Sequence, residues 1–268
     1  MNRTRAVHTQ SELAKRRCLY CLGDGPSTNE EHVIPAAFGL AQTERWIIPA
    51  GGVCNHCNRW LGTQVDAPLI HRFDLTLARA LGGVAGRGGR VRVIQGRNAT
   101  ARLDVTIGGQ DVQLFASRAE PTHDGGLDIE IRPETRDPPD IVRRTVRALW
   151  KMALGATWHA DHQLALDPRW DHLRLGVLGH PFRGYLLQQP MVVAPIERVH
   201  LDVRLETSGD PGAVTFVAGG VVLSAPLMPG HRVPASDLVA AGWEIQSTED
   251  RARDVIHLRL DPNDDQER

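Results

Sequence analysis

Two pairs of cysteines are the residues whose type and spacing most directly indicate chemistry. Each pair is a C-x2-C motif, and together they comprise all the cysteines of the chain: Cys18, Cys21, Cys54 and Cys57. A C-x2-C turn directs two thiolates toward one point, and two such turns supply the four ligands of a tetrahedral zinc site. Four thiolates leave no coordination position open, so we expect this zinc to be structural and not catalytic. Unrelated reduced cysteines and a redox or iron–sulfur site are the alternatives.

Acidic, imidazole and amide groups lie in the segments that this zinc site would join. Glu30, Glu31 and His32 follow the first pair within the run EEHVIP, and Asn58 directly follows the last cysteine. A neutral histidine accepts a proton near neutral pH, and carboxylate and amide oxygens suit Mg²⁺ or Mn²⁺. Taken singly, these residues have plainer interpretations as solvated glutamates, a loop histidine and a helix N-cap asparagine.

The order of these motifs adds a stronger indication. In sequence, C-x2-C, E-H-V-I-P and C-x2-C-N-x3-G resemble the HNH, or His-Me-finger, endonucleases of the four-cysteine zinc type. The resemblance covers residues 18–66, about a fifth of the chain. It implies a zinc-clamped ββα-metal finger with the acid–His pair on a β-hairpin and the Asn on a following helix. By the same resemblance, His32 is the general base, and Glu31 and Asn58 hold a catalytic Mg²⁺ or Mn²⁺, with Glu30 as a lesser candidate.

The resemblance also implies an activity, which is metal-dependent hydrolysis of DNA phosphodiester bonds to 5′-phosphate and 3′-hydroxyl ends. Such hydrolysis needs an activated water and a cation beside the departing oxygen. Bacterial or phage defence, or restriction, is the role expected by analogy. RNA is the alternative substrate, since nothing in the finger selects between the two sugars. The alternative from another class is a zinc-stapled module that binds nucleic acid or a protein partner without cleaving it.

One departure from the family pattern concerns the base. Many HNH enzymes carry a further Asn between the acid–His pair and the second cysteine pair, where it helps to orient the base. The corresponding stretch here, residues 43–50, reads TERWIIPA and contains no Asn. A main-chain carbonyl is then the remaining group that could orient His32.

Composition sets the broad class of the protein. The chain has 268 residues, 41% of them hydrophobic and 24% charged, with a net charge of −1, so we expect one or two globular domains. The balanced charge excludes a protein that binds nucleic acid by bulk positive charge. No apolar run approaches the ~20 residues of a membrane span, and the first seventeen residues lack the apolar core of a secretory signal. These features predict a cytoplasmic protein without a membrane segment.

The remainder of the chain predicts an α+β fold, with the finger over residues 1–71 and a mixed helix and antiparallel-sheet region over residues 72–268. The pattern DPP indicates a linker near residues 133–140. Asp66, two before Pro68, reads as the N-cap of a helix that runs to about residue 81, and an amphipathic helix is expected over about residues 140–157. Alternating apolar residues predict strands near 103–107, 112–114, 127–131, 199–205, 214–218 and 256–260.

Basic residues in this second region are candidates for nucleic-acid contact. One group lies in a stretch that has no acidic residue, and a second is spaced one turn apart on the predicted helix; the candidates are Arg87, Arg90, Arg92, Arg97, Arg143, Arg147 and Lys151. Solvated strand and helix faces are the alternative. His56 is expected to be exposed, and His159, His162 and His172 to be structural. Nothing else in residues 72–268 names an activity, so substrate binding, a protein partner or an activating ligand is assigned there.

Overall fold

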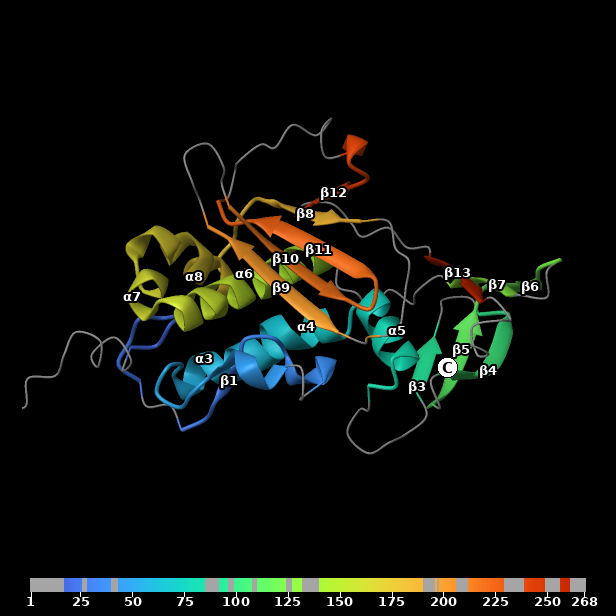
Figure 1. Cartoon of the computed structure of the whole chain (residues 1–268), viewed down its shortest axis with the longest axis horizontal. Coiled ribbons are helices and arrows are strands. Elements are labelled where there is room, and N and C mark those ends of the chain that lie inside the picture. Colours follow the sequence, from blue (N-terminus) through green and yellow to red (C-terminus); the bar gives the residue numbers. More distant parts are fainter. Residues whose placement is uncertain are drawn as a thin grey trace, which may run out of the picture.

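The structure is a computed structural model. It describes residues 17–25, 28–39, 43–84, 92–95, 99–107, 110–123, 127–131, 140–189, 196, 198–205, 212–228, 239–248 and 256–260. These residues form a mixed α+β arrangement of helices and mainly antiparallel sheets (Figure 1). The α+β class expected from the sequence is therefore confirmed.

The N-terminal part contains a two-stranded sheet followed by a long helical segment. Strand β1 (Glu31–His32) pairs antiparallel with β2 (Ile47–Ile48), with Glu31 opposite Ile48. Two short 3-10 turns, η1 (Ala36–Phe38) and η2 (Glu44–Trp46), lie between the strands. Helix α3 (Asn55–Trp60) begins after Cys54, whose sulfur accepts a hydrogen bond from the backbone N–H of Cys57. The second cysteine pair thus supplies the N-cap of the helix.

This helical segment continues further than the sequence indicated. Helix α3 runs without interruption into the π-helix η3 (Leu61–Asp66) and then into α4 (Ala67–Ile70). Helix α5 (Phe73–Leu81) follows after a break at His71 and Arg72. Asp66 has helical backbone angles and caps nothing with its side chain. The prediction of Asp66 as an N-cap is therefore wrong, and its carboxylate serves another purpose described below.

Helix α6 (Ile141–Ala160) is the central element of the molecule. In Figure 1 it lies between a five-stranded sheet and the α3–α4 segment. The sheet has the order β12-β8-β11-β10-β9, and all its neighbouring strands are antiparallel. Its strands are β8 (Tyr185–Gln188), β9 (Val199–Arg204), β10 (Ala213–Ala218), β11 (Val221–Pro226) and β12 (Glu244–Ser247). Short helices pack at one end of α6: α7 (His162–Ala165), η4 (Pro168–Trp170) and α8 (Asp171–Val177).

Two smaller sheets lie away from the finger (Figure 1). One has the order β13-β7-β6 and the other β3-β5-β4. Their strands are β3 (Arg92–Gln95), β4 (Ala101–Ile107), β5 (Gln110–Ala116), β6 (Arg118–Pro121), β7 (Leu127–Ile131) and β13 (Ile256–Leu260). The strands predicted near 103–107 and 112–114 form the antiparallel pair β4–β5, but β3 pairs with β5 in parallel, so the region is not wholly antiparallel. The predicted linker at 133–140 lies outside the described residues, apart from Asp140.

One hydrophobic core joins the finger to the rest of the chain. It includes Leu19 and Val33 from the finger, Trp150 from α6 and Phe216 from the large sheet. One close approach is at Gly155 of α6, where a Cβ atom would lie 2.5 Å from a methyl carbon of Val33. The segments predicted as two regions therefore bury their apolar side chains together. Among the described residues, none of the helices is long and apolar enough to cross a membrane.

Candidate functional site

The four cysteines converge as the sequence predicts. Their sulfur atoms all lie within 4.8 Å of one another, and Cys21 Sγ is 3.8 Å from Cys54 Sγ. Zinc–sulfur bonds of about 2.3 Å in a tetrahedron place the sulfurs about 3.8 Å apart. All four cysteines are free thiols, and three of them are buried. The cluster can hold a metal ion, and its geometry is consistent with structural zinc.

Neighbouring thiols of the cluster shift one another's pKa. Hydrogen bonding with the Cys57 side chain lowers the pKa of Cys18 to about 5 despite its burial. The same interaction raises the pKa of Cys57, with burial adding to the effect. One sulfur therefore carries negative charge readily, which is the form that a metal ion binds.

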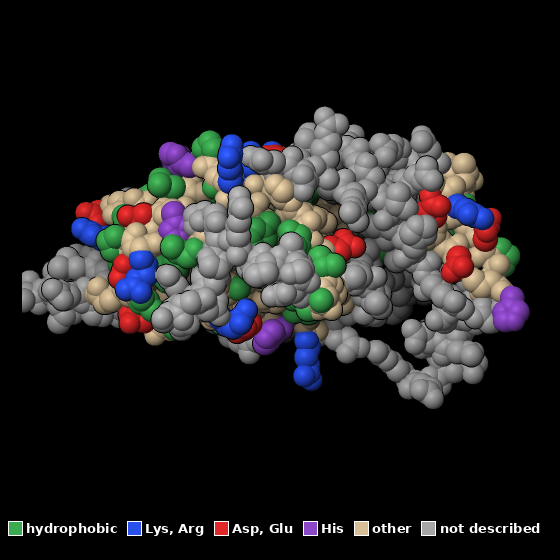
Figure 2. Space-filling view, turned by 90° about the horizontal axis from the view of Figure 1, so that it is seen from above, with side chains coloured by type: hydrophobic (Ala, Val, Ile, Leu, Met, Phe, Trp, Pro, Cys, Tyr) green, Lys and Arg blue, Asp and Glu red, His purple; other side chains and the backbone are tan. Residues whose placement is uncertain are grey.

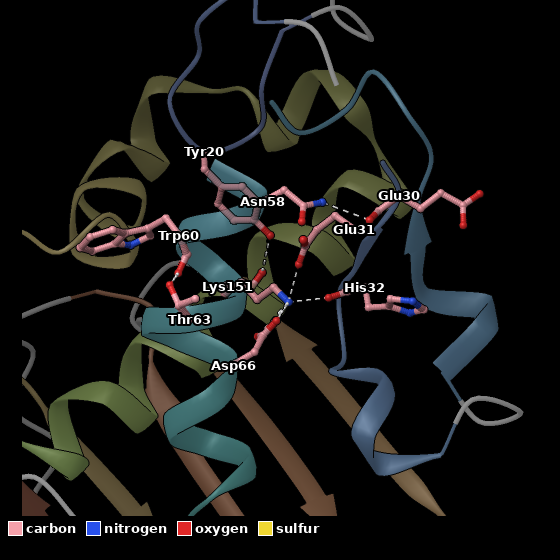
Figure 3. A network of polar contacts seen from close by, with 9 residues as sticks. All are labelled: Tyr20, Glu30, Glu31, His32, Asn58, Trp60, Thr63, Asp66 and Lys151. Carbon is pink, nitrogen blue, oxygen red and sulfur yellow. Dashed lines mark hydrogen bonds and ion pairs between the residues drawn. The ribbon is translucent and has the colours of Figure 1, made fainter. Parts of the chain in front are cut away.

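Strand β1 and helix α3 bring the other predicted residues into one region. Glu31 and His32 form β1, and Asn58 lies in the interior of α3, so the alternative of Asn58 as a helix N-cap is wrong. The Asn58 Nδ2 group donates a hydrogen bond of 3.1 Å to the main-chain carbonyl of Glu30 (Figure 3). This bond ties the helix that follows the second cysteine pair to the strand that carries the acid–His pair. The side chain of Glu30 itself is exposed and points away (Figure 3).

The carboxylate of Glu31 faces inward and is already paired. Its Oε1 atom lies 2.6 Å from Nζ of Lys151, a residue of α6. The same ammonium contacts both carboxylate oxygens of Asp66 at 3.0 Å and donates a hydrogen bond to the main-chain carbonyl of His32 (Figure 3). We call the oxygen atoms around Lys151 Nζ the oxygen cage. They belong to the carboxylates of Glu31 and Asp66 and to the main-chain carbonyl of His32. Lys151 is 0% exposed and Glu31 is 4% exposed.

Burial and charge oppose each other within the oxygen cage. Burial raises the pKa of Asp66 to about 6. The ammonium of Lys151 opposes this shift only in part, and repulsion from Glu31 adds to it. Burial alone would lower the pKa of Lys151, but the two carboxylates outweigh it and raise that pKa. Tyr20, from the first cysteine pair, is fully buried beside the cage with its hydroxyl 3.5 Å from the Lys151 carbonyl. Burial and the negative charges of the cage raise the pKa of Tyr20 well above its ordinary value.

The side chain of His32 points away from the oxygen cage, because successive side chains of a strand alternate between its two faces (Figure 3). Its Nδ1 atom is buried and has no hydrogen-bond partner among the described residues. No main-chain carbonyl therefore replaces the family's orienting Asn in the described part of the chain. A hydrogen bond at Nδ1 is the usual means of fixing which ring nitrogen carries the proton.

A catalytic divalent cation does not fit the residues to which the sequence assigns it. Glu31 is buried and its Oε1 atom is paired with an ammonium, so this oxygen can bind Mg²⁺ or Mn²⁺ only if Lys151 leaves. Asn58 directs its amide nitrogen at the Glu30 carbonyl, and the side chains of Glu31 and His32 lie on opposite faces of β1. The structure thus supports the cysteine site and disagrees with Glu31 as a ligand of a second metal.

The structure bears differently on each of the basic residues predicted to contact nucleic acid. The prediction that Lys151 contacts nucleic acid is wrong, because its side chain is fully buried. Arg143 donates to the Thr248 carbonyl and Arg147 to the Gly179 carbonyl, so both guanidinium groups have partners within the chain, and contact of either with nucleic acid stays a prediction. Arg87, Arg90 and Arg97 lie outside the described residues, as does the side chain of Arg92. On the face in Figure 2, the described basic side chains are scattered among acidic and apolar ones.

Three histidines of the second region contact neighbouring groups of the chain. His159 and His162 contact the ring of Trp158, and His172 pairs through Nε2 with the Leu227 carbonyl at 2.7 Å. Among the described residues, they belong to no group of possible metal ligands. His56 is exposed, as expected.

Sequence reasoning missed the partners of Glu31. Lys151 looked like part of a basic stripe because it follows Arg147 by one helical turn. Its immediate neighbours, in the run LWKMALGA, are apolar on both sides, and Lys15 is the only other lysine of the chain. These apolar neighbours were the available signal that Lys151 is buried. A fully buried lysine is almost always paired, so an acidic partner followed from that signal. Asp66 gave no such signal.

Comparisons with protein-family models, with curated proteins and with solved structures find no match for this chain.

Proposed function

We propose that this chain is a phosphodiester hydrolase that acts on DNA, with a zinc-stapled finger as its reactive part. The hydrogen bond from Asn58 to the Glu30 carbonyl carries the proposal, because it joins the metal-binding turn to the strand that presents His32. Cys18, Cys21, Cys54 and Cys57 would hold the zinc, which supplies rigidity at the start of α3 and leaves no position open for substrate.

The chemical step assigned to this chain is proton abstraction by His32. Nδ1 of the imidazole is buried, so Nε2 is the nitrogen that takes the proton of a water attacking phosphorus. The bond from phosphorus to the 3′ oxygen breaks, and that oxygen leaves and takes up a proton from solvent. A neutral imidazole is suited to that step near neutral pH. No step is assigned to a divalent cation at Glu31, since that carboxylate is paired with Lys151.

The proposal is tested by cleavage of supercoiled plasmid, linear duplex, single-stranded DNA and RNA by zinc-loaded protein, each with and without Mg²⁺ or Mn²⁺. His32→Ala should abolish cleavage, whereas the matched control His71→Ala, which changes an exposed histidine at the end of α4, should leave it intact. Cleavage that persists in purified His32→Ala protein would show that His32 is not the base. Preferential cleavage of RNA would change the substrate and keep the chemistry.

A second candidate function is a zinc-stapled module that binds nucleic acid without cleaving it. Two observations favour it: Glu31 is occupied by Lys151, and Nδ1 of His32 has no partner among the described residues. Fluorescence anisotropy with labelled duplex DNA separates the two functions. Binding by wild-type and His32→Ala protein alike, with no cleavage in any metal condition, would establish the module and exclude the hydrolase.

A further inference from the structure

The oxygen cage has the ligands of a cation site and holds an ammonium. Two carboxylates and one main-chain carbonyl surround Lys151 Nζ, with contacts of 2.6 Å to Glu31 and 3.0 Å to Asp66. Carboxylate and carbonyl oxygens are the hard ligands that Mg²⁺, Mn²⁺ and Ca²⁺ bind. The position beside Glu31 where a divalent cation was expected is therefore filled by a group of the chain itself.

We propose that Lys151 is a positioning residue of the candidate site, whose ammonium replaces a divalent cation beside Glu31 and holds the backbone of His32 in place. The part that concerns His32 rests on the proposed hydrolase. The part that concerns the cation does not, since it is a statement about what the oxygen cage binds.

The charges of the cage explain why a cation must be present there. Two carboxylates with an ammonium leave one negative charge without a counterpart, and removal of the ammonium would leave two. Isolated buried carboxylates are strongly unfavourable, so a cage without Lys151 would either take up protons or bind a cation of charge +2. The side chain of Asp66 is 14% exposed, so this side of the cage reaches solvent.

The contacts of Lys151 also fix the relative position of three segments. The ammonium reaches β1 through Glu31 and the His32 carbonyl, and it reaches the end of η3 through Asp66, eight residues after Asn58 in the same helical segment. One turn along α6, Gly155 lets Val33 approach closely. Helix α6 therefore determines how β1 and the α3–η3 helix face each other, and the finger depends on a residue far outside the predicted finger.

Gain of metal binding is the readout that a merely structural lysine would not produce. We would titrate Mn²⁺ into zinc-loaded protein and follow the loss of the free Mn²⁺ signal by electron paramagnetic resonance. Lys151→Ala makes space in the cage and should gain one Mn²⁺ site, which Glu31→Gln in the same variant should weaken at least tenfold. Lys151→Met removes the charge but fills the space, so it should gain no site. Arg144→Ala is the control on the same helix, since Arg144 pairs with Asp140 away from the cage.

Two results would overturn the cation part of the proposal. One is a Mn²⁺ site in the wild-type chain that disappears in Glu31→Gln, because the cage would then load a metal with Lys151 in place. The other is a folded Lys151→Ala protein that gains no Mn²⁺. If Lys151→Ala does not fold, the comparison of wild-type with Glu31→Gln protein still decides whether the native cage takes a metal.

The positioning part is tested by cleavage kinetics. Lys151→Met should lower kcat at least tenfold with KM and zinc content unchanged, because His32 is displaced while the binding surface is not. An unchanged kcat would remove Lys151 from the positioning of His32. If wild-type protein cleaves nothing, the proposed hydrolase fails, and the Mn²⁺ titration still decides which cation the cage holds.

Discussion

The ammonium of Lys151 lies 2.6 Å from Oε1 of Glu31, and this buried ion pair joins the central helix α6 to strand β1. A buried pair contributes little net stability when it is intact, because desolvation offsets the attraction. Breaking it is costly, since the remaining charge is buried without a partner. The pair therefore acts mainly to specify where β1 sits on α6.

Replacing Lys151 with Met should destabilise the protein strongly. Glu31 and Asp66 would both lose their cationic partner, and removing one member of a buried ion pair costs about 3–5 kcal/mol. The free energy of unfolding, measured by urea denaturation of zinc-loaded protein, checks this. The triple variant Lys151→Met, Glu31→Gln, Asp66→Asn should recover most of the loss, because no charge is left buried. A Lys151→Met protein as stable as wild type would contradict the ion pair.

Gly155→Ala should also destabilise the protein, for a steric reason. The new Cβ atom would lie 2.5 Å from Val33 Cγ2 and 2.8 Å from its Cγ1, so α6 and the finger would have to separate. Overpacking of this kind costs about 1–3 kcal/mol. Gly62→Ala is the matched control, since nothing lies within 4 Å of its Cβ position and alanine is favoured over glycine in a helix by up to about 1 kcal/mol. Thermal unfolding of the two variants should shift in opposite directions.

The cysteine cluster should bind about one zinc ion per chain, and its loss should unfold the finger. Binding free energy at a structural zinc is also folding free energy, so Cys57→Ser should lose zinc together with the protection of the β1 and β2 amides from hydrogen exchange. His56→Ala changes an exposed residue between two of the ligands and should keep both. Elemental analysis of native, reduced wild-type protein with well under one zinc per chain would count against the metal site.

Asp66 should make stability depend on pH. Burial raises its pKa from the ordinary 3.8 to about 6 in the folded chain, so between about pH 4 and 6 the folded state binds a proton that the unfolded state does not. The free energy of unfolding contributed by this group therefore falls as pH rises through that window, by roughly 3 kcal/mol at most. Above about pH 6 the contribution is fully lost.

Asp66→Asn isolates this contribution from other groups that titrate in the same range. Urea denaturation of wild-type and variant protein at pH 4, 5, 6 and 7 gives the difference in stability at each pH. The variant should gain relative to wild type as pH rises toward 6 and then stay level. A difference that is constant from pH 4 to 7 would show that the carboxyl has its ordinary pKa.

Local spacing in the sequence was sufficient for the cysteine cluster and for part of the secondary structure, but it did not predict β8, β11, β12 or the short helices α7 and α8. Two C-x2-C turns direct their sulfurs inward whatever surrounds them, so Cys18, Cys21, Cys54 and Cys57 could be grouped before any fold was known. Alternation and helical periodicity likewise predicted β7, β10 and α6, because these patterns depend on which face of one element is buried. The parallel pairing of β3 with β5 was not predictable, since it is a contact between strands and leaves no period in either one.

The partners of the charged side chains were decided only by tertiary structure. Lys151 has helical spacing from Arg147, and spacing alone cannot tell a solvent-facing lysine from a buried one when both sides of the helix are covered. The family resemblance implied that Glu31 and His32 lie on a strand, where successive side chains alternate, and the sequence alone places Asn58 directly after a metal ligand. Packing of α6 against the finger decided that the Glu31 carboxylate meets an ammonium, because burial makes an unpaired charge too costly to keep.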